Sequence, residues 1–86
     1  MTCRIDRVFI EQGVVLRISG RITRGDLVVL RTALEEGRVV EVDLTEVELA
    51  DRDAVMLLAR IETNGIALRH CPAYIREWMT RERRRS

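Results

Sequence analysis

The chain of 86 residues is predicted to form one α/β domain, in which a four-stranded mixed sheet carries three helices mainly on one face. Short segments with apolar residues at every second position alternate with longer segments whose apolar residues recur every three or four positions. The predicted strands also carry charged residues opposite their apolar face, namely Arg17, Glu41, Asp43 and Arg69. Sheets covered on both faces have continuously apolar strands, so we expect helices on only one face here.

A hairpin is predicted at the start of the chain. Thr2–Ile10 forms its first strand, and Glu11–Gly13 has the length and the glycine of a hairpin turn. Val14–Ser19 forms the second strand, which Gly20 is expected to end. The apolar face of this second strand carries Val14, Leu16 and Ile18.

The first helix is predicted over Leu27–Glu36. Thr23 and Asp26 have the spacing of a capping box, in which a hydroxyl and a carboxylate satisfy free N–H groups at a helix start. Gly37 is expected to stop the helix. Its apolar stripe consists of Leu27, Leu30 and Leu34.

Two further strands and two further helices complete the predicted order. The third strand covers Val39–Leu44, and a loop over Thr45–Ala50 leads to a helix over Ala54–Asn64. The fourth strand covers Ile66–His70, and the last helix covers Ala73–Arg83. The residues expected to face the core are Val40, Val42 and Leu44 in the third strand, and Tyr74, Ile75, Trp78 and Met79 in the last helix.

The corner between the third strand and the second helix is acidic. Asp51 and Asp53 lie at the helix start, where free backbone N–H groups and the positive end of the helix dipole favour carboxylates. Such corners are common binding surfaces in α/β proteins. Asp51, Arg52 and Asp53 are therefore the candidate site, and helix capping alone is the simpler interpretation of the two carboxylates.

The charge of the chain is nearly balanced but unevenly distributed. The formal net charge is +1, and all fifteen basic residues are arginine. Residues 76–86 carry five Arg and two Glu, which gives +3, and the rest of the chain therefore carries −2. Because the chain has only three aromatic residues and no nucleic-acid-binding motif, we interpret 76–86 as a solvated helix end rather than a nucleic-acid contact.

No metal site, cofactor site or catalytic group is expected. Cys3 and Cys71 lie far apart, and the single histidine, His70, cannot complete a zinc site with Cys71. The glycines are scattered rather than grouped in a phosphate-binding loop. Acid–base chemistry by Asp51 and Asp53 stays an alternative, although no pocket is evident around them. No apolar segment is long enough to cross a membrane and no signal peptide is apparent, so we expect a cytoplasmic protein with reduced thiols.

The order of these motifs resembles the STAS domain, the family of bacterial anti-sigma factor antagonists. The resemblance covers about residues 5–80 and makes the whole chain, 1–86, a single STAS-like domain. The segments similar to family motifs are Leu16–Ile22, Val42–Thr45, Val47–Asp51, Asn64–Leu68 and Cys71–Ile75.

The resemblance implies a protein–protein interaction module without enzymatic activity. Its docking surface would comprise Asp51, Arg52 and Asp53, with Thr45 and Arg24, and the exposed helix Ala54–Asn64 that follows. The partner would be an anti-sigma factor with a kinase fold, a larger signalling assembly, or an ATPase or permease of a transporter. Small-ligand binding at the strand ends, which some family members show, is the alternative.

The chain departs from the family at two places. Arg52 occupies the position of the serine that a partner kinase modifies, so we expect no phosphorylation at 51–54. The one hydroxyl in the predicted loop before them belongs to Thr45, to which the family motif does not point. The fixed charges allow two opposite interpretations: Asp53 imitates a phosphorylated, weakly binding state, or Arg52 pairs with an acidic partner and maintains binding. Family members also continue beyond the position of Arg83, so we expect a second copy of this shortened chain to cover part of Trp78 and Met79.

Overall fold

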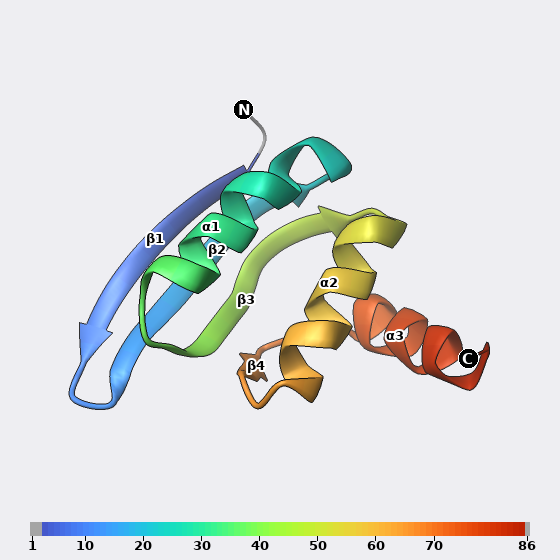
Figure 1. Ribbon diagram of the computed structural model, residues 1–86. Coiled ribbons are helices and arrows are strands. Elements are labelled where there is room, and N and C mark those ends of the chain that lie inside the picture. The colour runs from blue at the N-terminus through green and yellow to red at the C-terminus, as the bar shows by residue number, and fades with distance from the viewer. Residues whose placement is uncertain (1–2, 86) are drawn as a thin grey trace.

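The computed structural model describes residues 3–85, with side chains to residue 84, and shows one mixed sheet flanked by helices (Figure 1). Within those residues the strand order is β1-β2-β3-β4; β1 and β2 are antiparallel, and the other neighbours are parallel. Thr2, the expected first residue of β1, lies outside the described residues. The elements are β1 (Cys3–Ile10), β2 (Gly13–Ile22), the 3₁₀ turn η1 (Arg24–Asp26), α1 (Leu27–Glu36), β3 (Val39–Ala50), α2 (Arg52–Thr63), β4 (Ala67–Arg69) and α3 (Ala73–Arg85).

The predicted α/β class and the four-stranded mixed sheet are confirmed. α1 and α2 cover one face of the sheet, and α3 packs beside α2 (Figure 1). The core between sheet and helices has no buried polar side chain among the described residues. On the other face charged side chains meet each other, as in the ion pair of Arg69 Nε with Glu41 Oε1 at 3.1 Å. The largest fully buried side chains are Leu16, Ile18, Ile22, Leu30, Val42, Leu44, Val55, Leu58, Ile75 and Met79.

The second strand is longer than predicted because Gly20 does not end it. Gly20 has φ of 86°, a left-handed conformation that glycine adopts without a steric penalty, and the register with β3 shifts between Gly20 and Arg21. The irregularity lets the strand continue to Ile22, which is fully buried. The expectation that a glycine here stops the strand was therefore wrong.

The third strand is also longer, and the predicted loop over residues 45–50 is wrong. The extension of β2 offers hydrogen bonds to this segment, and pairing continues to Ile22 opposite Ala50. Pairing thus overrides the polar local sequence. The core face also differs at the start of β3: the register shift between Val14 and Val15 makes Val39, rather than Val40, pack against the core.

The C-terminal helix is better anchored than the sequence suggested. Met79 is 0% exposed and Trp78 is half-buried within the single chain, so the expected reason for covering Met79 with a second copy does not hold. Glu62 of α2 accepts hydrogen bonds from Arg76 Nη1, at 2.7 and 2.9 Å, and from Arg83 Nη2, at 2.9 Å. The basic residues of α3 therefore include two that fasten α3 to α2.

The tight hairpin end depends on Gly13. Its φ is 152°, and a Cβ built there would lie 2.2 Å from the carbonyl oxygen of Arg38, which accepts a hydrogen bond from Val14 N. Gly13→Ala should therefore lower the free energy of unfolding by more than about 1 kcal/mol. Gly25→Ala is the matched control, because its Cβ would meet no atom closer than 4.0 Å. Urea denaturation of both variants provides the measurement, and equal stabilities would contradict the close approach.

The Glu62 cluster should make stability sensitive to acid. Hydrogen bonds from Arg76, then Arg83, hold the pKa of the Glu62 carboxyl below its ordinary value of 4.5, although partial burial opposes this. The ionised carboxylate thus stabilises the fold above the ordinary pKa, and this contribution disappears as the pH falls through the lowered pKa. Glu62→Gln should cost about 1–2 kcal/mol at neutral pH, and progressively less as the pH falls below the ordinary carboxyl pKa and through the lowered one.

Denaturant melts at several pH values on Glu62→Gln, beside Glu46→Gln, measure this difference. Glu46 is exposed and lies on β3, so its variant should follow the wild type at every pH. A deficit of Glu62→Gln that does not change with pH would show that the carboxylate charge is not what stabilises the contact.

Candidate functional site

The centre of the site is the side chain of Asp51, which caps α2. Its Oδ1 accepts a hydrogen bond from Ala54 N at 2.9 Å, and its Oδ2 accepts one from Arg24 N at 2.7 Å. The backbone N–H of Asp51 donates to Ile22 O at 3.1 Å. One residue therefore joins the end of β2, the 3₁₀ turn and the start of α2.

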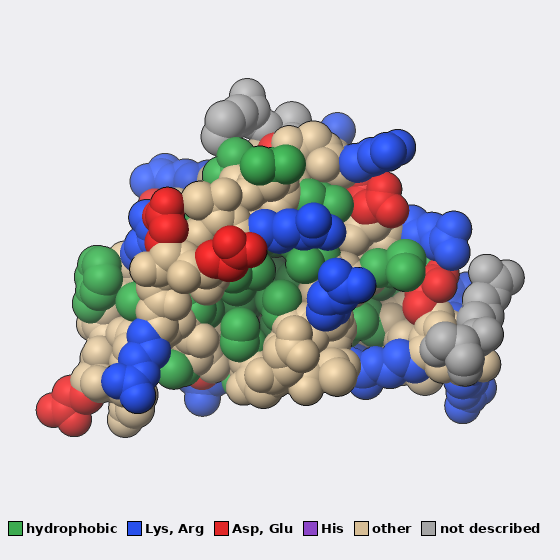
Figure 2. Space-filling view, in the orientation of Figure 1, with side chains coloured by type: hydrophobic (Ala, Val, Ile, Leu, Met, Phe, Trp, Pro, Cys, Tyr) green, Lys and Arg blue, Asp and Glu red, His purple; other side chains and the backbone are tan. Residues whose placement is uncertain are grey.

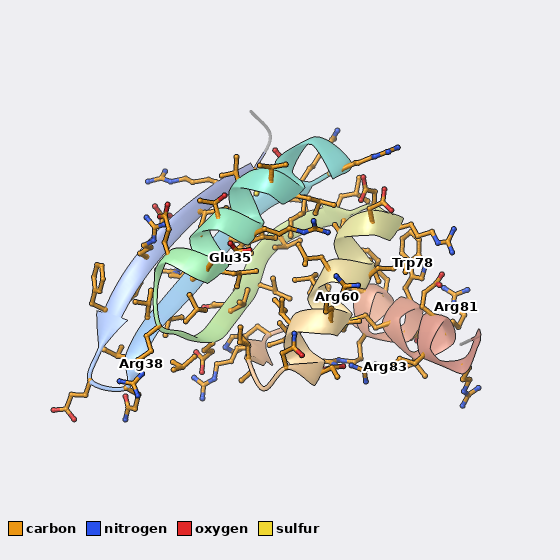
Figure 3. All side chains as sticks on the ribbon, in the orientation of Figure 1. Glu35, Arg38, Arg60, Trp78, Arg81 and Arg83 are labelled. Atoms are coloured by element: carbon orange, nitrogen blue, oxygen red, sulfur yellow. The ribbon has the colours of Figure 1, made fainter. Side chains whose placement is uncertain are left out.

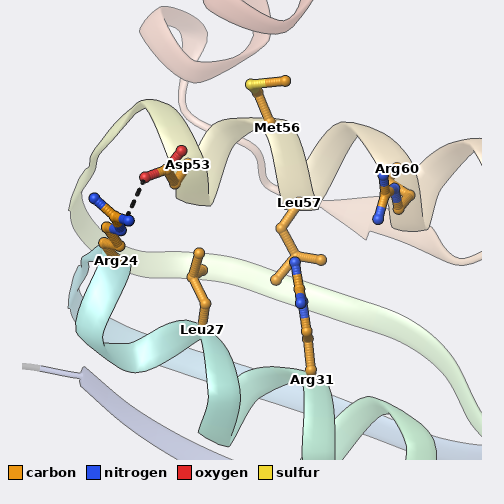
Figure 4. Close-up of a pocket in the computed structure, with 7 residues that line it drawn as sticks. All are labelled: Arg24, Leu27, Arg31, Asp53, Met56, Leu57 and Arg60. Carbon is orange, nitrogen blue, oxygen red and sulfur yellow. Dashed lines mark ion pairs between the residues drawn. The ribbon is translucent and has the colours of Figure 1, made fainter.

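Arg24 and Asp53 lie together beside this cap. Arg24 Nε is 3.8 Å from Asp53 Oδ2 (Figure 4), and their side chains are 86% and 51% exposed. The neighbouring Asp26 carboxylate accepts from Thr23 N at 3.0 Å and from the Thr23 hydroxyl at 2.9 Å, which fixes the turn that carries Arg24. Because β2 and β3 are parallel and end side by side, the residues that follow each strand meet at one corner.

Arg52 points away from its two acidic neighbours. Its Nε is 3.5 Å from Glu82 Oε1 on α3, and its side chain is 61% exposed. We call the group Arg24, Asp51, Arg52 and Asp53 the corner. Its exposed charges are Arg24 and Asp53 on one side and Arg52 on the side of α3, whereas Asp51 is occupied by backbone hydrogen bonds.

Thr45 does not belong to the corner. It lies on β3 six residues before Asp51, which is about 20 Å along an extended strand. Its hydroxyl donates to Asp43 Oδ1 at 2.6 Å, and this hydrogen bond is the main reason why the pKa of Asp43 is lowered. The structure therefore brings four of the five candidate residues together and places Thr45 elsewhere.

A groove between α1 and α2 adjoins the corner and was not predicted. It consists of two hollows of about 530 and 350 Å³, both bordered by Arg31, Leu57 and Arg60. We call it the α1–α2 groove. The apolar stripe of α1 was visible in the sequence, but the separation of the two helices was not, because it depends on how each helix packs on the sheet.

The thiols are not arranged for reactivity. Cys3 and Cys71 are both free, and burial is the main cause that raises the pKa of each thiol, so both are protonated at neutral pH. In the part of the chain that the structure describes, no group of three or more His, Cys, Asp or Glu side chains is placed to hold a metal ion.

Comparisons with known proteins neither support nor contradict the resemblance to the STAS family. No protein-family model matches the chain, and no curated protein matches it either. Among residues 3–85, none of the helices combines the length and the apolar character needed to cross a bilayer.

Asp51 should be the residue of the corner on which folding depends most. Asp51→Ala removes the acceptor of two backbone N–H groups and should lower the free energy of unfolding by about 2 kcal/mol, of which the helix cap supplies about half. Asp53→Ala removes only an exposed ion pair and should cost less than about 0.5 kcal/mol. Thermal and urea melts of the two variants compare them directly; a larger loss for Asp53→Ala would reverse the assignment.

Proposed function

We propose that the chain is a non-enzymatic interaction module resembling an anti-sigma factor antagonist, which docks a regulatory protein in the cytoplasm through the corner and α2. The observation that supports this most is the position of Arg52 and Asp53. Both are exposed in the first turn of α2, on a segment that the Asp51 cap holds in one conformation. Rigid support with exposed charge is what a docking surface requires, because little conformational entropy is lost on binding.

The fixed charges favour a permanently binding module over a switched one. In the family, the switch adds nearly two negative charges at the position of Arg52. Here the guanidinium of Arg52 is present instead. It lies 3.5 Å from Glu82 of α3 and its side chain is still 61% exposed, so it can contact an acidic group of a partner while it keeps its ion pair with Glu82. Asp53 carries only one negative charge, and Arg24 lies 3.8 Å away, which makes it a weak imitation of phosphate.

The proposal is tested by measuring how the variant Arg52→Ser binds candidate partners. These are the kinase-fold anti-sigma factors and the transporter ATPases of the source organism. If Arg52 contacts an acidic group, the variant should weaken binding by roughly 1.5–3 kcal/mol, or about 10- to 150-fold in Kd. Arg52→Ser should leave the fold intact, because only one exposed ion pair is lost. Titration calorimetry measures the affinity and a denaturant melt measures the stability of the same samples.

Arg81→Ser is the matched control, since Arg81 is an exposed arginine on α3 outside the corner. It should bind like the wild type. An unchanged affinity of Arg52→Ser would move the docking surface away from the corner, and binding to a transporter ATPase rather than to an anti-sigma factor would assign the module to transport.

A further inference from the structure

The α1–α2 groove has an apolar floor and apolar side chains along its sides. Leu57 and Ile61 of α2 are buried at its base, and Leu27 and Leu34 of α1 are only partly buried along its side. Hydrophobic side chains gather in the hollow between the two helices (Figure 2). The apolar surface that stays open to water comes from Leu27, Leu34 and Met56, which is 47% exposed, and only slightly from the floor.

Two arginines without an ion partner border this floor. Arg31 extends from α1 toward Leu57 of α2, and Arg60 reaches the groove from α2 (Figure 4). Neither forms an ion pair or a side-chain hydrogen bond with any residue that the structure describes. Their guanidinium groups can therefore turn toward an incoming carboxylate without breaking an existing contact.

The charges around the groove that form no ion pair with a described residue are those of Arg31, Arg60 and Glu35, which sum to +1. Of its acidic residues, Asp53 lies at one end beside Arg24, at 3.8 Å. Glu35 lines the second hollow from α1, and Arg60 lies on α2 (Figure 3); Glu35 forms no ion pair with a described residue, so one carboxylate stands among the two arginines. An occupant with carboxylates beside an apolar stripe would match both the floor and the two arginines.

The dimensions favour a helix as the occupant. α2, with 12 residues, is about 18 Å long, so the groove can hold about three turns of another helix. The two hollows on either side of Arg31, Leu57 and Arg60 suit two apolar side chains one or two turns apart. The open side of the groove would leave an acyl chain exposed to water but would suit the polar face of an amphipathic helix.

We propose that the α1–α2 groove binds an acidic amphipathic helix of a partner protein. Leucine-like side chains of that helix enter the two hollows, and its carboxylates pair with Arg31 and Arg60. The groove shares α2 with the proposed docking surface, but Arg31, Leu57 and Arg60, on which this inference depends, lie outside the corner, so it does not depend on the proposed function. A partner could engage the corner and the groove together, since Arg24 and Asp53 border both.

The probe is a capped synthetic peptide of about 15 residues, helical in design, with leucines at i, i+4 and i+7 and glutamates flanking them. Titration into the isotope-labelled full chain should shift backbone amide signals of α1 and α2 and leave those of β1 unchanged. The double variant Arg31→Glu/Arg60→Glu should bind the peptide at least about 10-fold more weakly, because two charge-assisted contacts become repulsive. Arg31→Gln/Arg60→Gln should give a smaller loss.

Arg17→Glu/Arg81→Glu is the matched control, since it changes the net charge equally on surfaces away from the groove. Circular dichroism of each variant checks that the fold is intact. Equal weakening by both double charge reversals would show non-specific attraction and would overturn the proposal. The absence of any shift at about 1 mM peptide, or shifts produced by laurate but not by the peptide, would overturn it as well.

Discussion

The carboxylate of Asp51 connects the segments on which the candidate surfaces depend. It accepts hydrogen bonds from the first turn of α2 and from the turn after β2, at 2.9 and 2.7 Å. These contacts are short because β2 and β3 run in parallel and end together, with Ile22 opposite Ala50. The junction holds the start of α2 beside the turn that precedes α1, at the end of the groove where Arg24 and Asp53 lie.

The two surfaces around α2 differ in how firmly their charges are held. On the side of α3, Arg52 pairs with Glu82, and Glu62 binds Arg76 and Arg83, so this side has a fixed arrangement. On the side of α1, Arg31 and Arg60 have no such partners among the described residues. A charge that is already paired contributes mainly orientation to binding, whereas an unpaired one can contribute a new contact.

Some parts of the site were predictable because their signals are local. The N-cap at Asp51 and the Thr23–Asp26 box depend on residues three apart, and both form as expected. The extension of β3 through residues 45–50 was not predictable, because its hydrogen-bonding partner lies in β2. For the same reason Thr45, which was expected in a loop near the corner, lies on a strand and bonds to Asp43.

The sequence by itself determined the class of the fold, the one-sided sheet, the Thr23–Asp26 box and the Asp51 cap, since periodicity and capping act over a few neighbouring residues. Tertiary structure alone decided that Arg24 meets Asp53, that Arg52 turns to Glu82, and that α1 and α2 leave a groove between them. These features depend on strand register and on helix packing across the sheet. Such long-range geometry has no counterpart in the local spacing of residues.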